Sequence, residues 1–185
     1  MNRSATLALA ALLSAGITTT AFAQDNPTVG GAPMMMDMDI VANAMNSPIH
    51  TTLVAAVSEA GLVETLQGEG PFTVFAPTDE AFAALPEGTV ETLLKPENCE
   101  QLTKVLTAHV VAGTVTADDL MAGIASSSDG FYHFNALSGD ALSAQAVDGA
   151  VFIHDESGNA YRVSTADVMQ SNGVIHVVDG VFLPN

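Results

Sequence analysis

The chain has 185 residues, of which 4 are Lys or Arg and 21 are Asp or Glu, so its formal net charge at pH 7 is −17. This length fits a single domain. The charge makes nucleic acids and anionic lipid surfaces poor partners, because both are bound mainly through Lys and Arg. The single cysteine, Cys99, excludes a disulfide within the chain.

The N-terminus has the pattern of a secretion signal. Arg3 lies in a short basic start, residues 7–17 are mostly apolar, and residues 21–23 (AFA) have the small-x-small pattern of a signal-peptidase site. We therefore predict a signal peptide over residues 1–23 that is cleaved near Ala23. The expected product is secreted, periplasmic or extracellular. No later segment has the apolar length that a transmembrane segment needs.

The stretch after the predicted cleavage site is rich in Gly, Pro, Asp and Asn. Such a composition buries too little apolar area to become ordered. We therefore predict a flexible leader over residues 24–37 and one domain over residues 38–185.

A methionine-rich segment lies at the end of this leader and contains Met34, Met35, Met36 and Met38. In an exported protein, clustered thioethers can bind Cu(I), because soft ligands suit that ion. This suggests an alternative function as a periplasmic copper or small-ligand binding protein, with His50 as a further ligand. A structural interpretation competes with it: Met38, Val41 and Met45 have helical spacing and predict a helix that docks on the core.

Residues 70–85 (GPFTVFAPTDEAFAAL) combine a strand and a helix. Apolar side chains occupy both faces of residues 72–76, as in a central strand that is covered on both sides. Pro77 ends the ladder because it has no N–H to donate. Thr78 is predicted to be the N-cap of a helix whose first turn contains Asp79 and Glu80. Phe82 belongs to the apolar face of this helix.

Apolar residues at spacings of three and four predict further helices. They cover residues 53–60, 62–66, 90–94 and 99–109, and Gly61 and Pro96 end the first and third. Cys99 lies on the apolar stripe of the last helix. We interpret its thiol as a core group, with a nucleophilic or dimer-forming role as the alternatives.

The second half of the chain has mainly β signals. Thr116 is predicted to cap a helix over residues 117–121. Asp148-Gly149 is a strong hairpin turn signal, because both positions tolerate a positive φ. The predicted strands cover residues 131–134, 142–147, 150–154 and 160–163, and a central strand follows in residues 173–184.

Reactive constellations are not apparent in the sequence. The histidines are dispersed as His50, His109, His133, His154 and His176. Their spacing does not match a zinc site, and the motifs typical of hydrolases, nucleotide binding or calcium loops do not occur. His109 and His176 lie in apolar runs, where a neutral imidazole usually bonds to the backbone or to a hydroxyl.

Residues 70–85 and 172–184 (NGVIHVVDGVFLP) resemble the two signature segments of the fasciclin (FAS1) domain family, and the resemblance extends over residues 38–185. It implies an α+β fold in which a wedge of β-strands packs with a layer of short helices. It also implies that the two segments pair as neighbouring central strands. Members of this family are mostly secreted or surface-attached adhesion proteins without catalysis, so no cofactor is expected. The residues that carry the signature are Phe72, Phe75, Pro77, Thr78, Asp79, Phe82, Asn172, Gly173, His176 and Asp179.

The resemblance also indicates candidate binding residues. Ala108-His109 stands where the family usually has Tyr-His, so the histidine is kept and the tyrosine is missing. Asp167-Val168-Met169 is similar to an Asp-Ile-Met sequence that is implicated in integrin binding in vertebrate relatives. The candidates are therefore His109, Asp167, Val168 and Met169. In the competing structural interpretation, Asp167 caps a turn while Val168 and Met169 pack.

Together these features predict an exported, non-enzymatic adhesion module that binds a protein or polysaccharide at the cell surface or in the matrix. Copper or small-ligand binding through the methionine-rich segment is the alternative. An enzyme that uses His109 or His176 ranks third. The ligand and the oligomeric state stay open.

Overall fold

The computed structural model describes residues 27–86 and 88–183. The helices are α1 (Ile40–Asn46), α2 (Thr51–Glu59), α3 (Val63–Leu66), α4 (Asp79–Ala83), α5 (Thr89–Leu93), the 3₁₀ turn η1 (Pro96–Asn98), α6 (Cys99–Ala108) and α7 (Ala117–Ser126). The strands are β1 (Thr28–Val29), β2 (Ala32–Pro33), β3 (Phe72–Pro77), β4 (Val110–Ala112), β5 (Tyr132–Asn135), β6 (Ala141–Val147), β7 (Ala150–His154), β8 (Ala160–Gln170) and β9 (Gly173–Val178). The predicted signal peptide, residues 1–23, lies outside the described residues.

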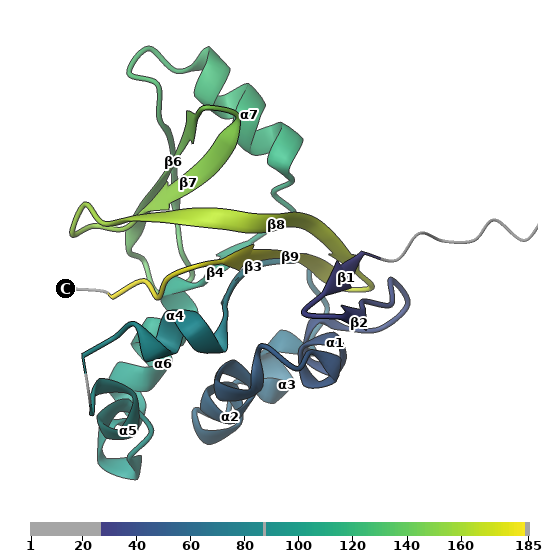
Figure 1. Cartoon of the computed structure of the whole chain (residues 1–185), viewed down its shortest axis with the longest axis vertical. Helices are drawn as coiled ribbons and strands as arrows, with labels where there is room; N and C mark the ends of the chain where they lie inside the picture. The colour runs from purple at the N-terminus through teal and green to yellow at the C-terminus, as the bar shows by residue number, and fades with distance from the viewer. Residues whose placement is uncertain (1–26, 87, 184–185) are drawn as a thin grey trace, which may run out of the picture.

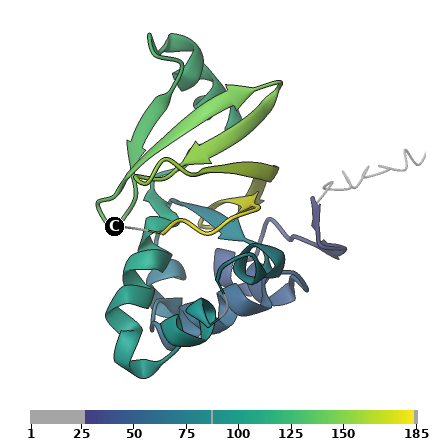
Figure 2. The same cartoon turned by 60° about the vertical axis from the view of Figure 1, so that its left-hand side comes forward.

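Seven of these strands form one mixed sheet in the order β4-β3-β9-β8-β7-β6-β5. β3 and β9 run parallel, with Phe75 opposite His176, and the other neighbouring pairs in this sheet are antiparallel. The two signature segments are therefore adjacent strands inside the sheet, as the sequence predicted. Helices α1 to α6 gather beside β3 and β9, whereas α7 lies at the other end of the molecule, beside β5 and β6 (Figures 1 and 2). This is the expected α+β fold.

Two hydrophobic clusters hold these layers together. The larger one joins α1, α2 and α6 to one face of β3 and β9, and Leu53, Val105 and Val177 are among its buried members. The smaller one lies under α7, where Leu120 packs with Phe75 and other buried side chains of the sheet. Because Val74 and Phe75 belong to different clusters, β3 is buried on both faces.

The passage from β3 into α4 follows the predicted chemistry. The Thr78 side chain accepts a hydrogen bond from the Ala81 N–H at 3.2 Å, which makes Thr78 the N-cap of α4. The Asp79 carboxylate accepts hydrogen bonds from Thr51 and Thr52 at the start of α2, at 2.8 Å from the Thr52 nitrogen. Asp79, one of the signature residues, therefore links the start of α4 to the start of α2.

The prediction of a flexible leader is wrong for residues 27–37. β1 and β2 pair as a short hairpin, and both Val29 and Met34 are buried in the larger cluster, with 3% and 2% of their surface exposed. The composition of this segment did not reveal the hairpin, because two apolar side chains are enough to anchor it. The core on which they pack is formed by the rest of the chain.

Other differences concern element bounds. Helix α1 begins at Ile40, after the N-cap Asp39, and Met45 is 67% exposed, so the methionines do not form its buried stripe. Cys99 is half-buried at the start of α6, with its sulfur 3.7 Å from the Glu59 carbonyl oxygen. β8 continues to Gln170, well beyond the predicted end at residue 163.

Candidate functional site

Asp167 lies at an irregularity in β8. The pairing of β8 with β9 shifts its register between Thr165 and Val168, and Asp167 has a φ of 55° there, in the left-handed region. Aspartate tolerates this conformation better than most residues. Its carboxylate accepts a hydrogen bond from the Ala117 N–H at 2.7 Å. Asp167 thus binds the first residue of α7, which satisfies one of the free N–H groups at that helix end.

His176 lies directly behind this bulge on β9. Its Nε2 donates to the Val115 carbonyl oxygen at 2.7 Å, and its Nδ1 accepts from the Asp167 N–H at 3.3 Å. The imidazole is fully buried, and this burial lowers the pKa of His176 below its usual value. His176 is therefore a neutral link between β9, the bulge and the loop before α7.

His109 has an equivalent structural role at the end of α6. Its Nδ1 donates to the Val105 carbonyl oxygen at 2.7 Å, and its Nε2 accepts from the Phe182 N–H at 2.9 Å. The imidazole stacks on the Phe182 ring with centroids 4.4 Å apart. Burial lowers the pKa of His109 to about 4. This histidine fixes the C-terminal segment to the helical layer.

These positions limit the predicted binding residues. His109 is 2% exposed and Val168 has no exposed surface, so neither can contact a partner in this structure. Asp167 and Met169 are half-buried. His109 bonds to the backbone and Val168 packs in the core, as the structural interpretation of the sequence expected. Only Asp167 and Met169 remain as candidates for a surface role.

A surface groove of about 610 Å³ lies beside Met169. The turn between β8 and β9 forms one wall and the loop between α3 and β3 forms another. Gln67, Glu69, Thr114 and Ser171 line it with exposed polar side chains, and Glu69 is its one ionisable residue. We call this feature the β8–β9 groove. Sequence reasoning missed it, because its walls come from three loops whose proximity no local pattern reveals.

The signature residues lie around this groove and in the core below it. The Asn172 side chain donates to the Leu66 carbonyl oxygen at 2.7 Å and accepts from the Ile40 N–H at 3.1 Å. Asp179 accepts from the Arg162 N–H at 2.7 Å, at the other end of β9. Phe75 is completely buried and Phe82 is 6% exposed. Phe72 and Gly173 are opposite each other where β3 and β9 begin, and Pro77 is opposite Val178 where they end.

The methionine-rich segment places some of its side chains in the core and others on the surface. Met34 lies in the core beside Val29 and Ala44, whereas Met36 and Met38 are 38% and 39% exposed. The segment therefore does not present these three thioethers on one surface. Within residues 27–86 and 88–183, no group of three or more His, Cys, Asp and Glu side chains is placed to hold a metal ion.

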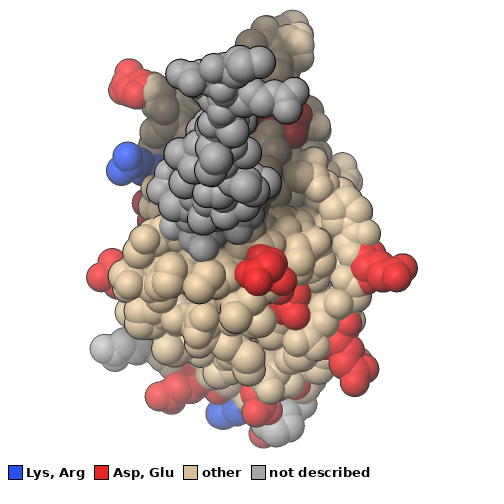
Figure 3. Space-filling view, turned by 90° about the vertical axis from the view of Figure 1, so that its right-hand side faces the viewer, with Lys and Arg blue, Asp and Glu red and all other residues tan. Residues whose placement is uncertain are grey.

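The distribution of charged side chains on the surface matches the acidic composition of the chain. Acidic side chains outnumber basic ones on the face that carries the β1–β2 hairpin (Figure 3). Across the part of the chain that the structure describes, no helix combines the length and apolarity required to cross a membrane.

Comparisons with known proteins agree with this architecture. The family model of the Fasciclin domain matches residues 48–184. Protein sll1483 of Synechocystis is 51% identical over 147 residues, which cover 80% of this chain and 74% of that protein. Transforming growth factor-beta-induced protein ig-h3 of Sus scrofa is 37% identical over 152 residues, which cover 82% of this chain and 20% of that protein.

A solved structure shows the same fold. The FAS1 domain pair of the insect cell adhesion molecule fasciclin I superposes with a TM-score of 0.67 at 18% identity, over 80% of this chain and 51% of that chain. The match of the family model spans most of the described residues, including both strands of the β3–β9 pair. This chain belongs to the fasciclin domain family.

Proposed function

We propose that this protein is exported and acts as a non-enzymatic adhesion module that binds a protein or a surface polymer at the cell surface or in the matrix. Membership of the fasciclin family supports this proposal, as does the shared fold with a domain pair from a cell adhesion molecule. The signal-peptide pattern of residues 1–23 supports export.

The observation that carries the proposal is the β8–β9 groove. Its volume is about 610 Å³, and it combines polar side chains with the half-buried thioether of Met169. Interfaces commonly combine a few apolar anchors with a polar rim. Because Glu69 is the one ionisable residue of the groove on a chain of net charge −17, the expected ligand is uncharged or basic there.

The buried histidines support a role without catalysis. His109 and His176 use both ring nitrogens in hydrogen bonds with backbone groups. A general base must reach the proton that it removes from a substrate. In their observed positions, both imidazoles hold segments of the fold together instead.

Attachment of coated beads to cells tests the proposal. Beads coated with residues 24–185 are counted on cells that lack the gene, and albumin-coated beads give the background. Thr114→Trp with Ser171→Trp fills the groove from two exposed positions, and we expect attachment to fall about tenfold, as for the loss of a binding hot spot. Ser58→Trp, at an exposed position of α2 outside the groove, is the matched control and should attach like the wild type.

Two outcomes would contradict the proposal. Wild-type beads that attach no better than albumin-coated beads would remove the adhesive function. A protein found only in the cytoplasm, with its first 23 residues intact by mass spectrometry, would remove export.

A further inference from the structure

The sheet section formed by β5, β6, β7 and β8 has one covered and one uncovered face. α7 packs on the inner face, where Leu120 meets Ile153 and other buried side chains. Among the described residues, no helix is drawn over the opposite face (Figures 1 and 2). We call this outer surface the open face, and its larger polar and aromatic side chains are Phe131, His133, Gln145, Phe152, His154 and Arg162.

Strand registers place these side chains in two parallel rows. His133 is paired with Ser143, which is paired with His154 on the next strand. Gln145 is paired with Phe152, which is paired with Arg162. Paired residues of neighbouring antiparallel strands project from the same face. The open face is therefore a broad surface of aromatic and hydrogen-bonding groups.

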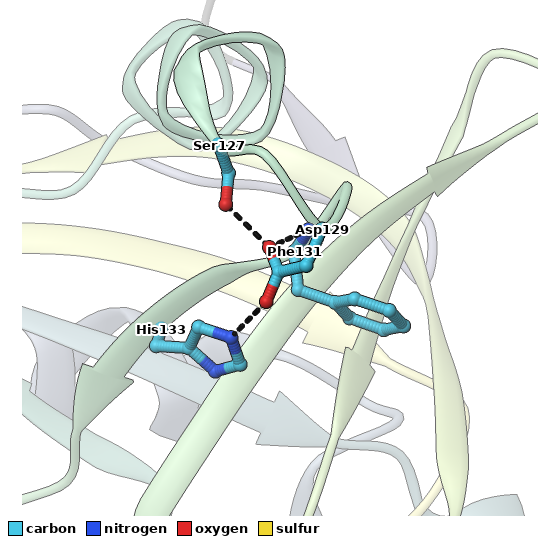
Figure 4. A network of polar contacts seen from close by, with 4 residues as sticks. All are labelled: Ser127, Asp129, Phe131 and His133. Atoms are coloured by element: carbon cyan, nitrogen blue, oxygen red, sulfur yellow. Dashed lines mark hydrogen bonds and ion pairs between the residues drawn. The ribbon is translucent and has the colours of Figure 1, made fainter.

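A polar network holds Phe131 in place at the edge of this surface. The Asp129 carboxylate accepts hydrogen bonds from Ser127 Oγ at 2.5 Å and from the Phe131 N–H at 3.1 Å (Figure 4). Its other oxygen lies 2.9 Å from His133 Nε2. The Phe131 ring meets the His154 ring edge-on, with centroids 5.4 Å apart. Phe131 is thus positioned before any ligand arrives, which reduces the entropy lost on binding.

The open face carries little net charge. The side chains named for it include one cation, Arg162, and no carboxylate, and the carboxylate that contacts them is that of Asp129, 2.9 Å from His133. His50, His109 and His176 are buried, so the histidines that solvent reaches, His133 and His154, both lie here. The open face is therefore close to neutral on a chain of net charge −17. A polyanion is repelled by the whole molecule, and a polycation is attracted to its acidic surfaces elsewhere.

We propose that the open face binds a neutral polysaccharide. The C–H face of a sugar ring is apolar and packs on the exposed parts of Phe131 and Phe152, which offer large rigid surfaces. Sugar hydroxyls accept from Arg162 and exchange hydrogen bonds with Gln145. The open face shares no residue with the β8–β9 groove. This inference goes beyond the proposed adhesion to one partner, because it gives the module a second binding surface.

Sedimentation with insoluble polysaccharides and titration with soluble ones test this surface. The neutral probes are cellulose, starch and laminarin, and the anionic probe is polygalacturonate. We expect residues 24–185 to bind at least one neutral probe, with no loss of affinity at high salt, since no ion pair forms. Phe131→Ala with Phe152→Ala should weaken this binding about tenfold or more.

A second variant and a control separate binding from folding. Gln145→Ala removes a hydrogen-bonding group and no ring, and it should weaken binding by a smaller factor. Leu137→Ala shortens an apolar side chain that is 45% exposed outside the open face, and it should bind like the wild type. Thermal unfolding of each variant shows whether it is folded at the temperature of the assay.

The results separate this inference from the proposed function. Absence of binding to all three neutral probes overturns the polysaccharide inference, and so does binding that the double variant leaves unchanged. Preference for polygalacturonate also overturns it. In each of these cases the attachment of beads, and its sensitivity to Thr114→Trp with Ser171→Trp, still decides whether the protein is an adhesion module.

Discussion

The β3–β9 pair and the β5–β8 section belong to one sheet but differ in what covers them. Val74, Phe75, Val177 and Val178 fill both faces of β3 and β9 and are at most 5% exposed. In β5 to β8, buried residues such as Ala144 and Ile153 alternate with solvent-accessible ones such as His133 and Arg162. The first region exposes little surface to a ligand beyond its start at the β8–β9 groove, whereas the second has a whole face.

This difference separates recognition of the family from recognition of a partner. The signature residues lie where burial on both faces restricts which side chains fit, so they identify the fold. The open face and the β8–β9 groove are formed by residues that solvent reaches, and packing restricts these much less. The most recognisable segments of this chain therefore mainly hold the structure together. The open face lies outside them, and the β8–β9 groove touches them only where β3 and β9 begin.

Truncating an aromatic ring in each region gives the largest contrast. Phe75→Ala should lower the free energy of unfolding by about 3–5 kcal/mol, because Phe75 is fully buried and its removal leaves a cavity. Phe131→Ala should lower it by less than about 1 kcal/mol, because this ring is partly exposed. Urea unfolding of both variants measures the difference. Similar losses for the two would show that the open face is part of the structural core.

Acid should weaken the buried region through His109. Its pKa is about 4 in the folded protein against 6.5 for an exposed histidine, so the unfolded chain takes up a proton that the folded chain excludes. The stability due to His109 is present above pH 6.5 and is lost as the pH falls toward 4, by about 3 kcal/mol in total. Burial lowers the pKa of His50 and His176 too, which acts in the same direction.

Urea midpoints measured between pH 7.5 and pH 4.5 check this dependence. His109→Gln keeps an acceptor for the Phe182 N–H but does not titrate, so its midpoints should fall less steeply with acid. Equal slopes for the variant and the wild type would place the acid sensitivity in other groups.

Asp167 connects the two regions, and its substitution should have a moderate effect. Asp167→Ala removes the acceptor of the Ala117 N–H and leaves a residue with a Cβ at a φ of 55°, so it should cost about 1–2 kcal/mol. Faster hydrogen exchange at the amide of Ala117 would locate the loss at the start of α7. Asp167→Asn keeps an oxygen acceptor and tolerates this φ, and it should be closer to the wild type in stability. If Asp167→Asn is stable but abolishes bead attachment, Asp167 contacts the partner directly.

The sequence predicted those parts of the fold that depend on neighbouring residues. Alternation in residues 72–76, the cap at Thr78 and the turn at Asp148-Gly149 were all found where local chemistry placed them. The pairing of β3 with β9 as neighbouring strands was also predicted, through the resemblance of both segments to one family, and the structure adds that they run parallel. The early end assigned to β8 was wrong because two irregularities, the first directly after Val163 and the second at Asp167, interrupt the alternation that marks a strand.

What the sequence alone determined was the family, the fold class and the strands and helices that local patterns define. The tertiary structure decided which of the candidate residues solvent can reach, because burial depends on contacts between distant segments. The bonds from Asn172 to Leu66 and Ile40, which are 106 and 132 residues away, are one example. The burial of His109 and Val168, the docking of Val29 and Met34, and the surface left open beside β5 to β8 all arise from such contacts.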